Sequence, residues 1–380
     1  MSLRVLTAAL AVLALAAPPA ARADDVLNPG TRLWVNAQST TVAAAAKLKG
    51  SDRRNALRLA AVPTSTWLTQ GTPAQVRAQA FEIGWRAARD RAVPVVTAYD
   101  IPGRDCSQYS AGGAANTKDY KAWIRGLSDG LARFRSVVIL EPDGIALAPA
   151  DCGGTADQQA MRVRQMNYAV DRLKALHGTA VYIDAGHSAW HAVGDIAARL
   201  VANGIDEADG FFLNVSNYRA NAELVRYGTM VSECISYVVD LGGKSGDCAN
   251  QFWPPADADA WYASHVTTPT RDLTHFVIDT SRNGQGPWTP PANTYSDPQD
   301  WCNPPGRGLG DRPTTRATGS PLLDAKLWVK VPGESDGSCN RGVDGSNVDP
   351  EWGGIVDPAA GRWFPQQALQ LAQLASPPLF

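Results

Sequence analysis

The sequence is poor in the residues that proteins use to hold metal ions. It has only five histidines in 380 residues, and these show no metal-ligand spacing. The six cysteines include no Cys-x-x-Cys pair, and there is no His-Glu-x-x-His helix and no phosphate-binding loop. These absences disfavour a zinc site, a metalloprotease and a phosphate-loop enzyme. We therefore expect neither a metal ion nor a cofactor.

An excess of charge of either sign is also missing. The net charge of −2 gives no electrostatic reason to bind nucleic acid or an anionic membrane surface. The one long apolar run, Val5–Ala17, follows Arg4 and precedes the small-x-small site Ala21–Ala23. The run is too short to cross a bilayer and has the form of a secretory signal peptide. We expect residues 1–23 to be removed and residues 24–380 to be secreted, with no membrane partner.

The expected mature chain has no low-complexity linker, charge block or internal repeat. Its Pro/Gly-rich stretches, Asn283–Pro291 and Gly333–Gly354, have the composition of long surface loops inside one domain. We expect a single domain that is a monomer.

Cysteine and tryptophan are the informative residue types that remain. An even number of cysteines in an exported chain predicts disulfides, although the sequence alone leaves their pairing open. Twelve tryptophans are many when aromatic residues make up only 8% of the chain. Indole rings stack on the apolar faces of sugars, but tryptophans also serve as core residues. The cysteines are Cys106, Cys152, Cys234, Cys248, Cys302 and Cys339.

Short apolar runs alternate with amphipathic stretches along the chain. Runs such as Val137–Leu140 are apolar on both faces, which is typical of buried parallel strands. Helical patterns lie between them, for example Pro73–Arg91, Thr117–Arg133 and Ala156–Leu176. Eight such strands with intervening helices predict an α/β fold, a complete or distorted (β/α) barrel. The eight runs are Leu33–Val35, Thr66–Leu68, Val93–Tyr99, Val137–Leu140, Ala180–Ile183, Phe211–Val215, His275–Ile278 and Ala325–Val329.

Polar residues follow most of these runs. A single carboxylate after a strand can be a helix cap, but capping alone does not explain six polar strand ends. In a parallel barrel the carboxyl ends of the strands meet at one mouth, where an active site lies. The segments are Tyr99–Asp100, Glu141–Asp143, Asp184–His187, Asn214–Asn217, Asp279–Arg282 and Lys330–Asp336.

Four aspartates stand out because each follows a different run: Asp105, Asp143, Asp184 and Asp336. Clustered carboxylates cannot all ionise cheaply, so at least one should keep its proton near neutral pH. A proton-bearing acid beside an ionised carboxylate is what hydrolysis of a glycosidic bond requires. A retaining glycosidase is an alternative, but it usually needs two glutamates after separate strands. Only Glu141 and Glu334 are so placed.

Six motifs stand in order along the chain: Tyr99–Cys106, Glu141–Asp143, Asp184–His187, Asp279–Gly284, Trp301–Arg307 and Leu327–Gly337. Together they resemble glycoside hydrolase family six, whose members are inverting endoglucanases and cellobiohydrolases that act on cellulose. The resemblance runs from about Leu33 to the C-terminus. It implies a distorted (β/α) barrel with the active site at the carboxyl ends of the strands, and one catalytic domain without a separate carbohydrate-binding module.

The resemblance also implies the roles of the carboxylates. Asp143 is similar to the general acid, and Asp105 to the aspartate that raises the pKa of that acid and helps to deprotonate the attacking water through a relay. Asp336 receives a secondary role in substrate binding and electrostatics. Asp184 is implied to be a substrate-side or structural carboxylate, and Tyr99 to favour distortion of the sugar at the scissile bond. Glu141 is expected to be structural.

Further residues are implied to bind cellulose and cello-oligosaccharides. The resemblance assigns sugar stacking to three tryptophans and hydroxyl binding to two charged residues, and His187 and Asn217 are expected in the same lining. It implies the disulfides Cys106–Cys152 and Cys302–Cys339, which leaves Cys234–Cys248 as the third pair. The stacking tryptophans are Trp34, Trp190 and Trp301, the hydroxyl partners are Lys330 and Glu334, and Trp67, Trp123 and Trp328 are expected to be packing residues.

Loop lengths favour an endoglucanase over a cellobiohydrolase. The segment Cys106–Thr117 is short and Gly-rich, as in the endoglucanases, whereas Gly337–Trp363 is of intermediate length. An insertion between Tyr218 and His275 departs from the compact pattern and either adds subsites or braces the barrel. A non-catalytic glucan-binding protein is a further alternative, but it would have lost the acid, and both Asp143 and Asp105 are present.

Overall fold

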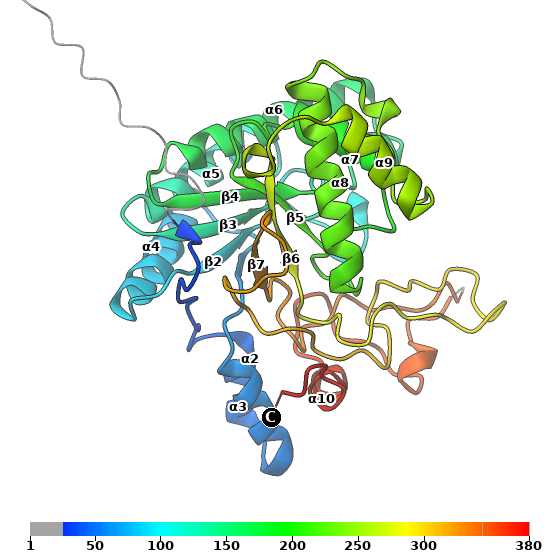
Figure 1. Cartoon of the computed structure of the whole chain (residues 1–380). Helices are drawn as coiled ribbons and strands as arrows, with labels where there is room; N and C mark the ends of the chain where they lie inside the picture. Colours follow the sequence, from blue (N-terminus) through cyan, green and yellow to red (C-terminus); the bar gives the residue numbers. More distant parts are fainter. Residues whose placement is uncertain (1–25, 344, 380) are drawn as a thin grey trace, which may run out of the picture.

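Seven parallel strands form the centre of the computed structural model, which describes residues 26–343 and 345–379. Each strand pairs with the next one along the chain, so the order of the sheet is the order of the sequence. The sheet curls, and helices cover its outer side (Figure 1). The strands are β1 (Thr66–Leu68), β2 (Val95–Ala98), β3 (Ser136–Leu140), β4 (Thr179–Asp184), β5 (Gly210–Leu213), β6 (His275–Asp279) and β7 (Leu323–Leu327).

Helices connect most of the strands, and the three predicted from periodicity are present as α4, α5 and α6. Two of them begin with a capping box, in which Thr72 and Thr155 cap α4 and α6. None of the described helices is long and apolar enough to cross a membrane. The helices are α2 (Thr40–Lys47), α3 (Gly50–Ala60), α4 (Pro73–Arg89), α5 (Thr117–Leu131), α6 (Ala156–Lys174), α7 (Val193–Ala202), α8 (Asn221–Val239), α9 (Pro255–His265) and α10 (Pro365–Gln373).

Side chains alternate between two buried faces along β2, β3, β4 and β5. In β3, Val137 and Ile139 point into an inner cluster made mainly of strand residues, which also contains Tyr182. Val138 and Leu140 pack on the other side, in the cluster that includes the helices. Burial on both faces explains why these runs are apolar throughout.

The barrel is incomplete, which corrects the expectation of eight strands. The predicted strand Leu33–Val35 contributes only an isolated bridge between Leu33 and Val93. Where the two edge strands approach, the described residues form one backbone hydrogen bond, from Ser65 N just before β1 to Trp328 O just after β7, at 2.9 Å. An apolar cluster of α3, α10 and neighbouring segments packs at this gap: Leu59, Leu309, Trp328, Ala368, Leu371 and Leu379. The predicted distorted barrel is thus confirmed, with seven strands.

Three disulfides brace the fold, and they are the expected pairs. They join Cys106 to Cys152, Cys234 to Cys248, and Cys302 to Cys339. The predicted signal peptide, residues 1–23, lies outside the described residues.

Candidate active site

A cleft of about 680 Å³ lies at the carboxyl ends of the strands. Every site residue predicted from the sequence lines it except Trp34. The predicted residues that it gathers are Tyr99, Asp105, Asp143, Asp184, His187, Trp190, Asn217, Trp301, Lys330, Glu334 and Asp336.

Asp143 has the environment of a carboxyl group that keeps its proton. Its pKa is raised well above the usual value, first by burial and then by the carboxylates of Asp184 and Asp105, while hydrogen bonding from Tyr99 opposes the shift. Asp143 also has a positive φ of 63°. Non-glycine residues rarely adopt this conformation, and such strain is typical of functional sites.

Two buried carboxylates fix the loops around Asp143. Asp184 accepts hydrogen bonds from the backbone N–H groups of Ala146 and Gly186, each at 2.9 Å, and so holds the segment that follows Asp143. Glu141 accepts hydrogen bonds from the N–H groups of Asp100 and Ile101, each at 3.0 Å. Glu141 is fully buried and does not line the cleft, so the expected structural role fits its position.

Asp105 faces the same cleft from the loop after β2. Its Oδ2 accepts a hydrogen bond from Ser110 N at 2.5 Å. Burial raises the pKa of Asp105, and the Ser110 N–H and the Arg104 guanidinium oppose this increase. The Cys106–Cys152 disulfide joins its loop to the segment after Asp143. The segments next to the two aspartates are therefore covalently linked.

Asp336 has the opposite environment. Arg282 Nη1 lies 2.8 Å from its Oδ2 and Lys330 Nζ lies 3.0 Å from its Oδ1. The N–H of Asn303 also donates to Oδ2 at 2.9 Å. Burial by itself would raise the pKa of Asp336, but Arg282 and Lys330 bring it to about 2. This paired, ionised carboxylate is a poor proton acceptor.

The sequence matches the model of glycosyl hydrolases family 6 over residues 28–375. The chain belongs to this family. It is 34% identical to Endoglucanase A of Cellulomonas fimi, covering 92% of this chain and 60% of that protein. It is also 34% identical to Endoglucanase 1 of Streptomyces halstedii, covering 90% of this chain and 92% of that protein. The chain spans 60% and 57% of the first two curated relatives, the Endoglucanase A proteins of Cellulomonas fimi and Thermobispora bispora.

Solved family-6 structures have the same fold. The endoglucanase Cel6 of Mycobacterium tuberculosis, in complex with methyl-cellobiosyl-4-deoxy-4-thio-β-D-cellobioside, superposes with a TM-score of 0.71 at 36% identity. The match covers 92% of this chain and 99% of that one. Cellobiohydrolase II of Humicola insolens superposes with a TM-score of 0.66 at 24% identity, covering 93% and 99% of the two chains, which shows the shared fold.

One tryptophan predicted to stack on sugars is buried, and one predicted to be a packing residue lines the cleft. Trp34 is 5% exposed, and its indole N–H donates to Asp90 at 2.9 Å, which places the ring in the core and speaks against sugar stacking. Trp67, expected in the core, lines the cleft and packs edge-on against Tyr99 at 5.5 Å. Trp67 lies in β1, where its side chain packs against the inner cluster at the mouth. Trp190 and Trp301 both line the cleft.

Lys330, Glu334 and His187, which are predicted to bind sugar hydroxyls or to belong to the polar lining, all line the cleft. Lys330 donates to Ser335 O at 3.0 Å in addition to pairing with Asp336. Burial raises the pKa of Glu334, and Lys330 and the hydroxyl of Thr40 oppose the shift. Burial also lowers the pKa of His187 to about 3, so its imidazole is neutral.

Arg104 and Tyr109 are among the cleft residues that the sequence reasoning did not single out. Arg104 donates to the carbonyls of Thr69 (2.7 Å) and Tyr99 and lies 4.6 Å from the Tyr99 ring, so it fixes the tyrosine beside Asp143. Tyr109 lies 6.0 Å from Trp301, ring to ring, and thus joins the loop after Asp105 to the opposite wall. Only these long-range contacts distinguish Arg104 and Tyr109 from ordinary loop residues.

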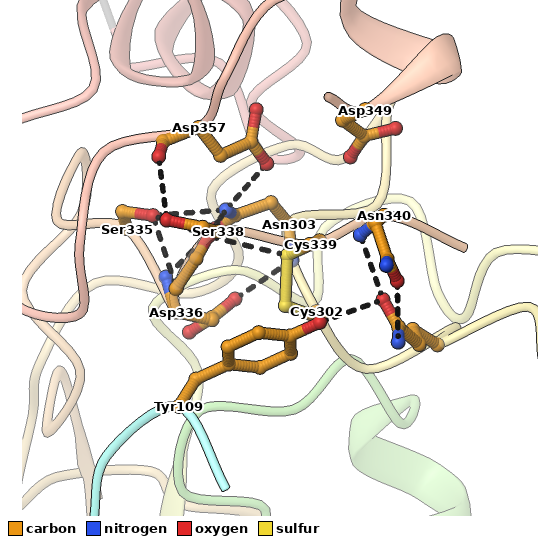
Figure 2. Close-up of a disulfide and its surroundings, with 12 residues drawn as sticks. Tyr109, Cys302, Asn303, Ser335, Asp336, Ser338, Cys339, Asn340, Asp349 and Asp357 are labelled. Atoms are coloured by element: carbon orange, nitrogen blue, oxygen red, sulfur yellow. Dashed lines mark hydrogen bonds between the residues drawn. A yellow bond between two sulfur atoms is a disulfide. The ribbon is translucent and has the colours of Figure 1, made fainter. Parts of the chain in front are cut away.

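The Cys302–Cys339 disulfide lies in a dense polar network behind Asp336 (Figure 2). Asn303 is its centre: its side-chain amide donates to Asp357 at 2.8 Å, and its Oδ1 accepts the Asp336 N–H at 2.8 Å. Asp349 and Asp357 lie beside the Cys339 sulfur with metal-ligand spacing. That sulfur is already bonded to Cys302, and the Asp349 carboxylate is paired with Arg341. This cluster is therefore a structural network.

The segment Gly333–Gly337 also has the Gly-x-Ser-x-Gly spacing of serine hydrolases. Ser335 is fully buried, and its hydroxyl donates to Gly337 O at 3.2 Å. The serine is therefore part of the network around Asn303 and is inaccessible to a substrate.

Proposed function

We propose that this protein hydrolyses β-1,4-glucosidic bonds of cellulose with inversion of the anomeric carbon. The observation that carries the proposal is that Asp143, Asp105 and Asp184 line one cleft. Burial there, and then the charges of the other two carboxylates, raise the pKa of Asp143. An acid that keeps its proton beside a second carboxylate is the pair required for glycoside hydrolysis.

In the proposed reaction, Asp143 transfers its proton to the glycosidic oxygen as the bond from that oxygen to the anomeric carbon breaks. A water molecule adds its oxygen to the opposite face of that carbon, and its proton passes toward Asp105. Tyr99 stands beside Asp143 and crowds the sugar at the scissile bond. Asp336, paired with Arg282 and Lys330, binds substrate and sets the local potential.

The names of the relatives support the substrate class. Proteins called endoglucanase are similar over 90% or more of this chain, and the Mycobacterium tuberculosis structure holds a thio-linked cellobioside. Relatives called cellobiohydrolase are also similar, for example 1,4-β-D-glucan cellobiohydrolase C of Emericella nidulans at 33% identity. We propose cellulose and cello-oligosaccharides as the partners of this chain.

An endoglucanase is the mode that we favour, since the Cys106–Thr117 loop is short. One observation favours the alternative, a cellobiohydrolase with a covered cleft. Tyr109 reaches across to Trp301, and its hydroxyl donates to Gln299 at 3.4 Å. In that mode the segment Gly337–Trp363 would cover the cleft. Shortening it is a poor test, because its Asp349 and Asp357 hold Arg341 and Asn303. Tyr109→Ala removes the contact with Trp301 and costs the network only the 3.4 Å hydrogen bond to Gln299.

Two measurements on cellulose substrates test the proposal. The first product of cello-oligosaccharide hydrolysis, observed early by NMR, should be the α-anomer; an initial β-anomer refutes inversion. The viscosity of carboxymethyl cellulose should fall rapidly relative to the reducing sugar released. Cellobiose as nearly the sole product, with little loss of viscosity, would establish the cellobiohydrolase alternative.

We also propose that the protein acts outside the cell. Three disulfides persist in oxidising compartments and are rare in the cytosol of mesophiles. The apolar run Val5–Ala17 supplies the export signal in this proposal. N-terminal sequencing of protein from the culture medium tests it, and a mature chain should begin near Asp24.

A further inference from the structure

Two adjacent aromatic residues are exposed at the tip of a turn in the insertion between Tyr218 and His275. Phe252 is 69% exposed, the largest value among the large apolar side chains described, and Trp253 is 39% exposed. They precede α9, next to Pro254 and Pro255. Exposing two aromatic rings side by side forgoes the burial that normally stabilises such residues, which is typical of a binding surface.

The turn is held rigidly by contacts from three directions. Gln251 donates through its side-chain amide to the carbonyls of Ser188 at 2.9 Å and His191 at 2.8 Å. The Tyr262 hydroxyl donates to Ala249 O at 2.6 Å. The disulfide between Cys248 and α8 anchors the other side. Rings on a fixed support lose little conformational entropy when they bind a ligand.

The same contacts place the turn beside the cleft. Ser188 and His191, to which Gln251 binds, flank Trp190, which lines the cleft and is 37% exposed. Trp190 follows β4 at the mouth of the barrel. Ser245, just before the turn, packs against Gly194 in the first turn of α7, so closely that a Cβ there would lie 2.0 Å from its carbonyl oxygen. The exposed rings therefore lie on the mouth side, next to the Trp190 loop.

We propose that Phe252 and Trp253 form an outer platform on which a β-linked glucan chain stacks after it leaves the cleft at Trp190. The inference rests on the proposed function and extends its binding site. The apolar faces of glucose units stack on such rings, as on Trp190. The occupant is an uncharged chain, because Asn250–Pro255 carries no charged side chain and Gln251 binds the loop that presents Trp190 to the cleft.

The test compares short and long ligands on an inactive protein. Asp143→Asn provides the background, and binding of cellotriose and cellohexaose is measured by calorimetry. Adding Phe252→Ala and Trp253→Ala should weaken the binding of cellohexaose about tenfold and leave the binding of cellotriose unchanged. The matched control is Phe81→Ala with Trp85→Ala, since these α4 residues are 48% and 44% exposed and do not line the cleft. The control should bind both ligands like the background.

The outcomes separate this inference from the proposed function. Unchanged cellohexaose binding overturns the platform, and so does an equal loss for cellotriose or an equal loss in the control. A dimer of the background protein that dissociates after the Phe252 and Trp253 substitutions, seen by sedimentation, would mean that a second copy covers the rings. If the background protein binds neither oligosaccharide, the proposed function itself fails.

Discussion

The two sides of the cleft treat the same residue type in opposite ways. On one side, Asp143 lies near Asp105 and Asp184 and its pKa is raised by burial and by their charges. On the other side, Asp336 is paired with Arg282 and Lys330, and its pKa falls to about 2 in spite of burial. The comparison shows that the partners, and not the depth of burial, decide which aspartate carries a proton.

The two sides also make opposite contributions to stability. A carboxyl whose pKa is raised by folding lowers the free energy of unfolding once the pH exceeds its pKa in the unfolded chain. Asp143 therefore reduces stability at neutral pH. The depressed pKa of Asp336 contributes stability above the unfolded pKa, and this is lost as the pH falls toward 2. For a shift of this size the contribution is about 2.5 kcal/mol. The side of the cleft that contains Asp143 thus lowers the stability of the fold at neutral pH.

The largest expected effect comes from removing the proposed proton donor, Asp143. Asp143→Asn should reduce turnover of cellulose by about 10²- to 10⁴-fold, because proton donation is lost while the aromatic platforms remain. Oligosaccharide binding should persist. A substrate with an acidic phenol leaving group should recover part of the rate because it needs less protonation. Activity near that of the parent on cellulose would remove Asp143 as the acid.

Breaking the paired side should affect folding first. Arg282→Met leaves the buried Asp336 without its main partner and should lower the free energy of unfolding by about 3–5 kcal/mol, measured in urea. The matched control is Arg226→Met, because the Arg226–Asp259 pair is exposed. It should cost about 0–1 kcal/mol. Equal losses in the two variants would contradict the difference in burial on which the comparison depends.

Two of the disulfides close loops of different length, one beside the catalytic candidates and one in the insertion after Tyr218. Replacing Cys106 and Cys152 by serine opens a loop with a sequence separation of 46. The chain-entropy model gives a loss of about 4 kcal/mol, and the separation between Asp105 and Asp143 should become less well defined. Replacing Cys234 and Cys248, with a separation of 14, should cost about 3 kcal/mol and leave turnover of short substrates intact. Thermal unfolding and turnover of cellotetraose measure both, and unchanged turnover without Cys106–Cys152 would count against its positioning role.

The smallest effect concerns the pH profile. Asp184→Asn removes a negative charge that raises the pKa of Asp143, so the pKa of the acid falls. The basic limb of kcat/KM should move to lower pH by about one unit. Asp129→Asn, an exposed residue paired with Arg172, should leave the limb in place. An unchanged limb in Asp184→Asn would show that Asp184 is not ionised beside Asp143.

Much of the fold and most of the candidate site could be predicted from the sequence. Runs such as Val137–Leu140 are apolar on both faces because both faces are buried, so a local pattern reports a tertiary fact. The polar residues after the strands predicted the cleft because parallel strands end together. Leu33–Val35 has the composition of a strand, yet only Leu33 forms a bridge, since pairing depends on a partner that the local pattern does not contain.

The missed residues act through partners that are distant in the sequence. Arg104 reaches a carbonyl 35 residues away, and Tyr109 contacts the ring of Trp301. Trp34 packs in the cluster that includes the helices, whereas Trp67 packs against the inner cluster and lines the cleft. Such roles require the packed chain, because no spacing in the sequence encodes them.

The gap between β1 and β7 bears on the solubility of the protein. A sheet that does not close leaves two edge strands, and an uncovered edge offers a template for pairing with other chains. Here Trp328, which directly follows β7, is buried in a cluster with Leu59 of α3 and Leu371 of α10. A charged residue at Leu371 should undock α10 and expose Trp328 beside the edge of β7, and we expect such a variant to aggregate. Docking of α10 thus limits association between copies of the chain.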